Sequence, residues 1–387
     1  MACMIMTKPK PRVLFYVQHL LGIGHLARAS RIADALFDHQ FDVTMMTGGT
    51  PVAGFPGPNI EHIELPTIAS GDAGFSGLVD SEGRPVDDAF KARRRDILLA
   101  EYARIKPDIV MIEAFPFGRR QVRFELIPLL KAIHASPDRP RVVCSLRDIL
   151  QERAKPGRDE ESIDLVRQYF DLVLVHGDPK FVRLEETFPL ADQIKDLIAY
   201  SGLVAARPPL PVNDKFDIVA SAGGGAVGID LVRAVSEAAK RLPDVKSWCI
   251  ITGPNLPDAA FDGVVKSAPK NVTVVRFRRD FPSLIANARL SISQAGYNTV
   301  CDVFNAGCRC LLIPFAAGGE TEQSQRAVRL EKLGLATVIP ESTLSTETMT
   351  AAIQKSLGAP KPPTLPLGLN GAAHTAKILH DMLESAE

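Results

Sequence analysis

The pattern that most constrains this fold is an alternation of short apolar runs with longer amphipathic runs, which occurs twice along the chain. The apolar runs have the length of strands and the amphipathic runs have helical periodicity, as in parallel sheets connected by crossover helices. Strands are predicted at residues 13–17, 42–46, 108–112, 141–145 and 172–175 in the first half, and at 217–220, 248–251, 272–275, 290–293 and 310–313 in the second. The sequence therefore predicts an α/β protein with two doubly wound, Rossmann-like domains.

The proline-rich segment from Arg207 to Pro211 separates the two halves. Several close prolines suit a stiff linker, because they continue neither a helix nor a central strand. We therefore expect an N-terminal domain over 1–206, a C-terminal domain over 212–365, and a tail over 366–387 whose helical pattern, Ala372 to Leu383, can pack back on the first domain. Ala69 to Ala89 has little periodicity and is expected to be a long surface loop.

Composition excludes several classes of protein. Lysine plus arginine equals aspartate plus glutamate at 45 each, so no overall attraction to nucleic acid is expected. No signal peptide and no apolar run near the roughly 20 residues of a membrane helix are evident, which predicts a cytoplasmic location. The six cysteines lack zinc-ligand spacing, so we expect buried reduced thiols and no metal site.

Two arginine clusters, at 93–95 and 276–279, are expected first to be solvated surfaces. The alternative is contact with anionic lipid headgroups or with an anionic acceptor. This alternative leaves open a peripheral position at the inner face of a membrane.

The first chemical motif is Gly22-Ile-Gly24-His25, between a predicted strand and a predicted helix. Glycines there let backbone amides approach a ligand, and the helix N-terminus favours negative charge. His25 would lie at the carboxyl end of a strand, where an imidazole can remove a proton from a hydroxyl group. A capping or packing histidine is the alternative. Ala27 replaces the last glycine of the dinucleotide-binding fingerprint, which weakens a nicotinamide function.

The second motif is the run Gly223, Gly224 and Gly225, which follows a predicted strand and precedes a predicted helix. Three consecutive glycines cost chain entropy and are favoured where an anionic group must touch the backbone. The motif lacks the Lys-Ser/Thr of a P-loop. It indicates diphosphate binding, with an unliganded tight turn as the alternative.

The third motif has two units, each at the end of a strand. In the first, Ala295 and Gly296 turn into a helix that carries Asn298, Thr299 and, two turns in, Asp302, whose carboxylate can accept hydrogen bonds from ribose hydroxyls. The second unit places three polar residues on a loop, where they can distinguish sugar hydroxyls; they are Glu320, Glu322 and Gln323. The two units in this order are the strongest signal in the chain.

In the first half, Glu113 ends a predicted strand and can orient His25 or receive a proton; a surface carboxylate is the alternative. The adjacent Phe115 to Phe117 can line an acceptor pocket or simply pack. Arg147-Asp148 and His176-Gly-Asp178 are further candidates at strand ends.

Residues 217–340 resemble the donor domain of GT-B glycosyltransferases, especially the branch of the peptidoglycan N-acetylglucosaminyltransferase and the monogalactosyldiacylglycerol synthases. The resemblance rests on the three glycines, Ala295-Gly296, Asp302 and Glu322-Gln323, and on Gly22 to His25 in the first half. This chain departs from the pattern of that branch in three places. Asp302 replaces a glutamate, and Glu322-Gln323 replaces a Gln-Gln pair. The loop near the base has Phe277 and Arg278 where more neutral residues are usual.

The resemblance implies a hexosyl transfer from a nucleoside diphosphate sugar, UDP being favoured, to a hydroxyl acceptor such as a glycan or glycolipid. His25 would act as the base, with inversion and without a metal or other cofactor. A nucleotide-sugar hydrolase, a 2-epimerase and a non-catalytic nucleotide-sugar-binding protein remain alternatives, and a dehydrogenase is least favoured.

Overall fold

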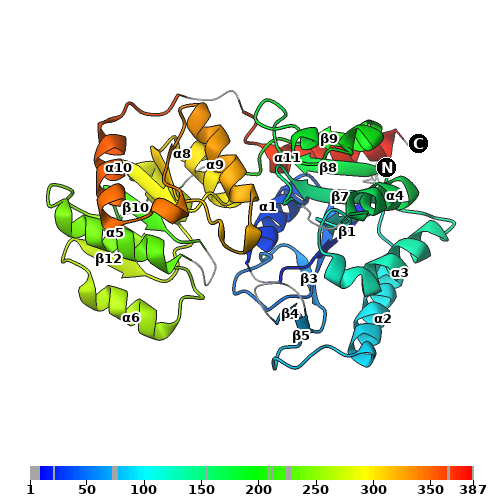
Figure 1. Ribbon diagram of the computed structural model, residues 1–387. Coiled ribbons are helices and arrows are strands. Elements are labelled where there is room, and N and C mark those ends of the chain that lie inside the picture. Colours follow the sequence, from blue (N-terminus) through cyan, green and yellow to red (C-terminus); the bar gives the residue numbers. More distant parts are fainter. Residues whose placement is uncertain are drawn as a thin grey trace, which may run out of the picture.

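The computed structural model describes residues 9–20, 22–71, 77–152, 156–207, 210, 212–223, 228–363 and 367–385. Figure 1 shows them as two α/β lobes, with the N-terminal domain on the right and the C-terminal domain on the left. Each lobe is built on one sheet of parallel strands with helices against both faces. The predicted α/β class with two doubly wound units is confirmed.

The N-terminal sheet has seven strands in the order β3-β2-β1-β6-β7-β8-β9, all of them parallel. They are β1 (Arg12–Val17), β2 (Asp42–Thr47), β3 (Glu61–Glu64), β6 (Ile109–Glu113), β7 (Arg141–Arg147), β8 (Leu172–His176) and β9 (Ile198–Tyr200). The central strand β1 is buried from Val13 to Val17, because helices cover both faces of a parallel sheet.

One face of this sheet packs against α2 (Asp88–Ile105), α3 (Arg123–His134) and α4 (Arg158–Tyr169). The other face packs against α1 (Gly24–Asp38) and α11 (Gly371–Glu384). Short 3-10 turns complete the domain; they are η1 (Arg120–Val122), η2 (Leu184–Glu186) and η3 (Ala191–Leu197).

The C-terminal sheet has six parallel strands in the order β12-β11-β10-β13-β14-β15. They are β10 (Ile218–Ser221), β11 (Trp248–Ile251), β12 (Val272–Val275), β13 (Leu290–Ser293), β14 (Cys310–Leu312) and β15 (Thr337–Val338). The helices and 3-10 turns around it are α5 (Ile229–Arg241), α6 (Asp258–Ser267), α7 (Phe281–Asn287), α8 (Tyr297–Ala306), α9 (Glu322–Lys332), α10 (Thr346–Gly358), η4 (Ala317–Gly319) and η5 (Glu341–Thr343).

Strand order reverses between β10 and β13, and in the first domain between β1 and β6. In open α/β sheets ligands bind beyond the carboxyl ends of the strands at such a point. The glycine-containing turns predicted to bind ligand follow β1, β10 and β13, which meet at these two points.

The chain passes between the domains twice. After the second sheet it returns to the first domain as α11, which packs on α1 and on the same apolar cluster, as Figure 1 shows in red at the right. The outgoing and returning segments pair where they meet: Leu203 N donates to Gly368 O (2.7 Å), and Gly371 N donates to Leu203 O (3.0 Å). The two connections therefore lie against one another at the domain boundary.

Several details differ from the sequence predictions. The expected loop over 69–89 contains an antiparallel hairpin, β4 (Ala69–Ser70) with β5 (Leu78–Val79), and the first residues of α2. Strands β3, β9 and β15 were not predicted, since they are short edge or near-edge strands with weak apolar runs. In the proline-rich linker, Pro208, Pro209 and Pro211 lie outside the described residues.

The prediction of a solvated face at 93–95 is wrong for Arg94. Its side chain is buried and donates two hydrogen bonds to Glu125, of 2.9 and 2.7 Å. An arginine can be buried in this way because its carboxylate partner is buried with it. The five cysteines that the structure describes are free and buried, as predicted. Of the helices among the described residues, none combines the length and apolar character that a bilayer crossing demands.

Candidate functional site

His25 lies in the first turn of α1, directly after the loop that follows β1. Its Nδ1 atom is 2.8 Å from Oε1 of Glu113, the last residue of β6. The helix start and the neighbouring strand end therefore bring the two predicted catalytic residues into contact. The predicted orienting role for Glu113 has the geometry that it requires, and the alternative of a surface carboxylate is wrong, because Glu113 is fully buried.

Glu113 is the centre of a buried polar group. Arg28, one turn after His25, donates to Glu113 Oε1, and Ser145 Oγ on β7 donates to Oε2 (2.6 Å). Burial alone would raise the pKa of Glu113. The charge of Arg28 and the hydrogen bond from His25 outweigh it and lower that pKa to about 2. Glu113 is thus a carboxylate at neutral pH and accepts hydrogen bonds from His25, Arg28 and Ser145.

The tautomer of His25 follows from this contact. Burial and the nearby charge of Arg119 lower the pKa of His25 to about 3, so the ring is neutral at pH 7. Because Glu113 is ionised, the proton of the neutral ring lies on Nδ1 and points to the carboxylate. Nε2 then carries a lone pair and has no hydrogen-bond partner among the residues that the structure describes. This is the arrangement of a histidine base that a carboxylate orients.

The polar group continues to β8. The two ring nitrogens of His176 lie 2.9 Å from Ser145 Oγ and 2.9 Å from Ser201 Oγ. Burial, reinforced by the charge of Arg28, lowers the pKa of His176 to about 3. His176 is therefore a neutral histidine whose ring contacts Ser145, the hydrogen-bond partner of Glu113.

The C-terminal domain meets this group through the start of α8. The hydroxyl of Tyr297, its first residue, donates to His176 O (2.8 Å) and accepts from Val204 N (2.9 Å). The guanidinium groups of Arg28 and Arg326 lie 5.0 and 5.7 Å from the centre of the Tyr297 ring. A tyrosine between two cations is a stable arrangement, since the ring faces carry negative potential.

Asn298, the second residue of α8, donates from its side-chain amide to the carbonyl oxygen of Gly24 (2.9 Å). The two predicted glycine-containing helix starts, at Gly24 and Gly296, are therefore neighbours across the domain boundary. Gly22 and Gly296 have open space where a Cβ atom would stand. Thr299 is half-buried on the next position of the same turn.

The triple-glycine turn is described only at its first residue. Gly223 has φ +73°, a backbone conformation that side chains disfavour, and a Cβ atom there would lie 3.3 Å from Oε1 of Gln294. Gln294 precedes Ala295 and Gly296, so the first glycine of the turn lies next to the start of α8. Gly224 and Gly225 lie outside the described residues.

Glu322, the first residue of α9, is 5% exposed at its side chain and lies between two arginines. Its Oε2 is 2.5 Å from Arg147 of β7, and its Oε1 is 2.5 Å from Arg326. Arg326 also donates to Ala295 O (3.0 Å). In the structure Glu322 is thus a cross-domain ion pair partner, and its predicted role in reading the sugar remains a prediction.

The predicted loop position is wrong for Glu322 and Gln323, which begin α9, and holds for Glu320 just before that helix. Gln323 and Glu320 have local hydrogen-bond partners. Gln323 accepts a hydrogen bond from Phe315 N (3.1 Å), and Glu320 accepts one from Glu322 N (2.9 Å). Burial and the charge of Glu322 raise the pKa of Glu320. Their predicted contact with the sugar remains a prediction.

Asp302 is buried on α8 with both carboxylate oxygens engaged. Arg31 of α1 donates to Oδ2 (2.9 Å), and Ala206 N donates to Oδ1 (3.1 Å). The predicted ribose contact would require Asp302 to exchange at least one of these partners. The role therefore remains a prediction, and its observed contacts are with the first domain.

Phe277 and Arg278, predicted to lie near the base, are on the loop between β12 and α7. Phe277 is about half exposed, and Arg278 pairs with Asp280 (2.7 Å) and Asp214 (2.8 Å). Their nucleotide contact also remains a prediction. The predicted pocket-lining alternative for Phe115 and Phe117 is not supported, because both are buried in the core of the first domain.

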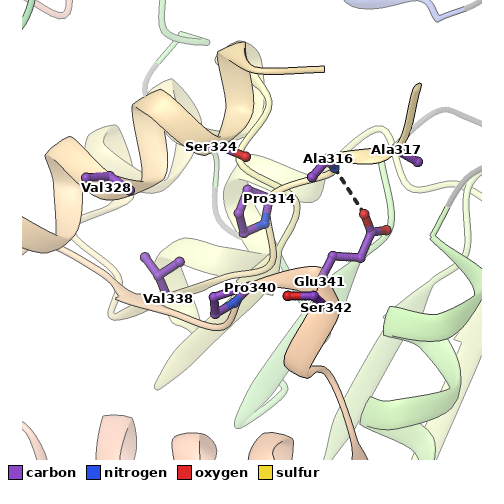
Figure 2. A pocket seen from close by; sticks show the side chains of 9 residues that line it. All are labelled: Pro314, Ala316, Ala317, Ser324, Val328, Val338, Pro340, Glu341 and Ser342. Atoms are coloured by element: carbon purple, nitrogen blue, oxygen red, sulfur yellow. Dashed lines mark hydrogen bonds between the residues drawn. The ribbon is translucent and has the colours of Figure 1, made fainter. Parts of the chain in front are cut away.

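A pocket of about 420 Å³ lies beside the loop after β14, between α9 and the segment after β15, as Figure 2 shows. Its walls are mostly proline, alanine and valine, and the amide of Ala316 donates to Glu341 there (3.0 Å). None of the predicted site residues lines it.

Three residues of the site were missed: Arg119, Tyr297 and Arg326. Arg326 follows Glu322 by four residues on a predicted helix, a spacing that signals an ion pair. Tyr297 lies inside the quoted motif but carries no signal of its cross-domain bonds. Among the described residues, no group of three or more His, Cys, Asp and Glu side chains is placed to hold a metal ion.

Residues 221–364 match the glycosyltransferase family 28 C-terminal domain. The UDP-N-acetylglucosamine--N-acetylmuramyl-(pentapeptide) pyrophosphoryl-undecaprenol N-acetylglucosamine transferase of Thermotoga neapolitana is 27% identical over 178 residues, which are 46% of this chain and 50% of that protein. The chain thus spans about half the length of this curated relative.

Solved structures resemble the whole chain. MurG of Acinetobacter baumannii matches 96% of this chain and 100% of its own, with a TM-score of 0.59 at 16% identity. The calicheamicin glycosyltransferase CalG4 matches 97% of this chain over 95% of its own length, with a TM-score of 0.58 at 17% identity. The fold is therefore GT-B, with two Rossmann-like domains, and the predicted resemblance to the peptidoglycan transferase branch is confirmed.

Proposed function

We propose that the protein transfers a hexosyl group from a nucleoside diphosphate sugar to the hydroxyl group of an acceptor. The acceptor oxygen attacks the anomeric carbon, and its proton passes to Nε2 of His25. The bond from the anomeric carbon to the diphosphate oxygen breaks, and the nucleoside diphosphate leaves with the electron pair. A single displacement of this kind inverts the configuration at the anomeric carbon.

The observation that carries this proposal is the contact between His25 Nδ1 and Glu113 Oε1, at 2.8 Å, opposite the segment 221–364 that matches a glycosyltransferase domain. A neutral histidine whose Nδ1–H is held by a carboxylate has its Nε2 lone pair directed outward. Such a group is unprotonated at neutral pH, and Glu113 stabilises the imidazolium that forms as the attacking hydroxyl group gives up its proton.

The donor diphosphate would lie at the start of α8 and on the turn that begins at Gly223. Gly296 leaves open space at that helix start, so the backbone can approach the ligand closely. Free amides and the positive end of the helix dipole stabilise negative charge on the leaving group. Transfer would then need no divalent metal, and EDTA should leave the rate unchanged.

Relatives narrow the substrates that we propose. The Thermotoga neapolitana relative is named for a UDP-sugar donor and a lipid-linked acceptor. We favour UDP and a glycan or glycolipid acceptor for this chain, with a peripheral contact at the inner face of a membrane. Glu320, Glu322 and Gln323 would recognise the hydroxyl groups of the donor sugar.

The first experiment identifies the donor. Thermal unfolding is recorded with a panel of nucleoside diphosphates and their sugars, because a ligand stabilises the folded chain by mass action. The second measures sugar transfer to acceptor extracts by the wild type and by His25→Ala. We expect a loss of at least about 100-fold in rate, with nucleotide affinity within about twofold. His39→Ala, at the far end of α1, is the matched control.

Each other outcome selects a different function. Rapid turnover of the nucleotide sugar without acceptor indicates a hydrolase or an epimerase. Binding without turnover against any acceptor indicates a nucleotide-sugar sensor. Near-wild-type transfer by His25→Ala rejects His25 as the base, and a product with retained anomeric configuration, measured by NMR before mutarotation, rejects the single displacement.

A further inference from the structure

Arg119 occupies an unusual backbone position at the end of the loop after β6. Its φ is +57°, in the left-handed region that residues with a side chain rarely adopt. The flanking backbone is fixed, since Gly118 N donates to Ala114 O (2.7 Å) and Val122 N donates to Arg119 O (3.1 Å). Arg119 is half-buried at this position, whereas the neighbouring Arg120 pairs with Glu161 of α4.

The surroundings of Arg119 are positively charged. Burial, with the charges of Arg147 and Arg28, lowers the pKa of Arg119 to about 10, so it remains a cation at pH 7. Its charge in turn lowers the pKa of both His19 and His25. The loop geometry agrees: Gly118 N is bonded to Ala114 O, and Ala114 directly follows Glu113, the partner of His25, so Arg119 lies near the His25–Glu113 pair.

The carboxylates near Arg119 already have partners. Glu113 is bonded to His25, Arg28 and Ser145. Two further buried carboxylates at the domain boundary are paired as well: Glu322 with Arg147 and Arg326, and Asp148 with Arg326.

Within the part of the chain that the structure describes, Arg119 has no ion pair, and its Nε atom is buried without a hydrogen-bond partner. Arg119 is half-buried, so a guanidinium without an ion-pair partner is unfavourable there, and a ligand that supplies an anion offsets this cost.

We propose that Arg119 binds an oxyanion of the acceptor, a phosphate or a carboxylate, next to the hydroxyl group that His25 deprotonates. The planar guanidinium can give such a group two parallel hydrogen bonds. The assignment to the acceptor rests on the proposed function, because Arg119 and His25 both belong to the N-terminal domain. The donor diphosphate has its own partners in the backbone at Gly223 and Gly296 of the other domain.

The test uses binding and not turnover. The protein is first saturated with the nucleoside diphosphate that stabilises it most, which fills the donor site. Inorganic phosphate and acetate are then titrated separately by calorimetry, and the histidine ring resonances are followed by NMR. Arg119→Gln is compared with Arg120→Gln, whose guanidinium in the wild type pairs with Glu161 on the outer side. Thermal unfolding verifies that each variant is folded, and Arg119→Lys is used if Arg119→Gln is not.

We expect at least one of the two anions to bind the wild type and Arg120→Gln equally and to bind Arg119→Gln at least about tenfold more weakly. If phosphate binds more tightly than acetate, the acceptor group is a phosphate; if acetate binds more tightly, it is a carboxylate. Binding of either anion should also shift the ring resonances of His25. Equal anion affinity in the Arg119 and Arg120 variants, or no anion binding to the wild type, overturns the proposal.

A third result, loss of nucleoside diphosphate affinity in Arg119→Gln, would place Arg119 at the donor and also overturns it. Failure of His25→Ala to impair transfer would reject the proposed base and leave this anion site standing. The two ideas can therefore fail separately.

Discussion

Arg326 of α9 donates a 2.6 Å hydrogen bond to Asp148, which follows β7, and the two side chains are each only 1% exposed. The pair connects the C-terminal domain to the N-terminal domain at a position closed to water. Arg326 also holds Glu322 of its own helix. One guanidinium therefore neutralises two buried carboxylates at the domain boundary.

Replacing Arg326 should be strongly destabilising. Arg326→Gln leaves Asp148 and Glu322 buried with reduced compensation, and breaking a buried pair costs about 3–5 kcal/mol. Urea unfolding measures the loss. Arg329→Gln is the matched control, one turn along α9, where the pair with Glu186 (2.7 Å) is partly exposed and should be worth less than about 1 kcal/mol. If Arg326→Gln and Arg329→Gln lower the free energy of unfolding by similar amounts, the buried pairs of Arg326 do not stabilise the domain boundary as described.

Arg31 and Asp302 distinguish a structural role from a ribose contact. If ribose must displace Arg31 from Asp302, Arg31→Ala should strengthen nucleoside diphosphate binding by about fivefold, since a charged hydrogen bond no longer competes. Asp302→Ala should weaken it. Calorimetric titration of both variants checks the prediction. A change in the same direction for both would show that the pair serves only to join the domains.

His176 should make stability depend on pH. Its folded pKa of about 3 lies below the ordinary value of 6.5, so the unfolded chain binds more protons between these values and stability falls as pH falls through that window. At pH 5 the contribution is a loss of about 2 kcal/mol relative to pH 7. His176→Asn removes the titrating group and should lack this loss. The free energy of unfolding of the wild type should therefore exceed that of the variant by about 2 kcal/mol less at pH 5 than at pH 7. A difference that stays constant in urea unfolding at both pH values would refute the assignment.

Gly202 should tolerate no side chain. Its φ is +87°, and a Cβ atom there would lie 2.7 Å from the carbonyl oxygen of Gly368. We expect Gly202→Ala to cost about 2–4 kcal/mol through strain and displaced backbone. Gly263→Ala is the control, because Gly263 lies inside α6 with open space around it and should gain about 0.5–1 kcal/mol. Thermal unfolding of the two variants gives the comparison, and equal effects would argue against a tight crossing.

The sequence predicted the frame of the protein because parallel strands covered on both faces leave continuous apolar runs. The strand at Trp248–Ile251 matches its predicted bounds, and β1 extends only one residue beyond its run. Short edge strands such as β15 carry too few apolar residues to be distinguished from loops. His25 and Glu113 could be predicted as neighbours because both follow central strands at the same edge of one sheet.

The contacts across the domain boundary could not be predicted in the same way. From the sequence, Arg31 is predicted only to be a polar residue on a helix. Nothing near it in the sequence indicates that its partner is Asp302, 271 positions later. The side-chain direction of Arg119 depends on a positive φ that its neighbours impose. The Arg31–Asp302 pair depends on how two finished domains dock, and the position of Arg119 depends on the conformation of one loop; local sequence patterns carry no information about either.

The paired segments at Leu203 and Gly368 have a mechanical consequence. A single connection would let one domain swivel in any direction, whereas two connections fixed side by side leave one axis of rotation. Any separation of the two domains should therefore resemble a jaw, with the gap widening with distance from that axis. Substrates would then enter and leave at the side remote from Leu203, and loss of the helix that follows Gly371 would free the joint in directions that the intact chain forbids.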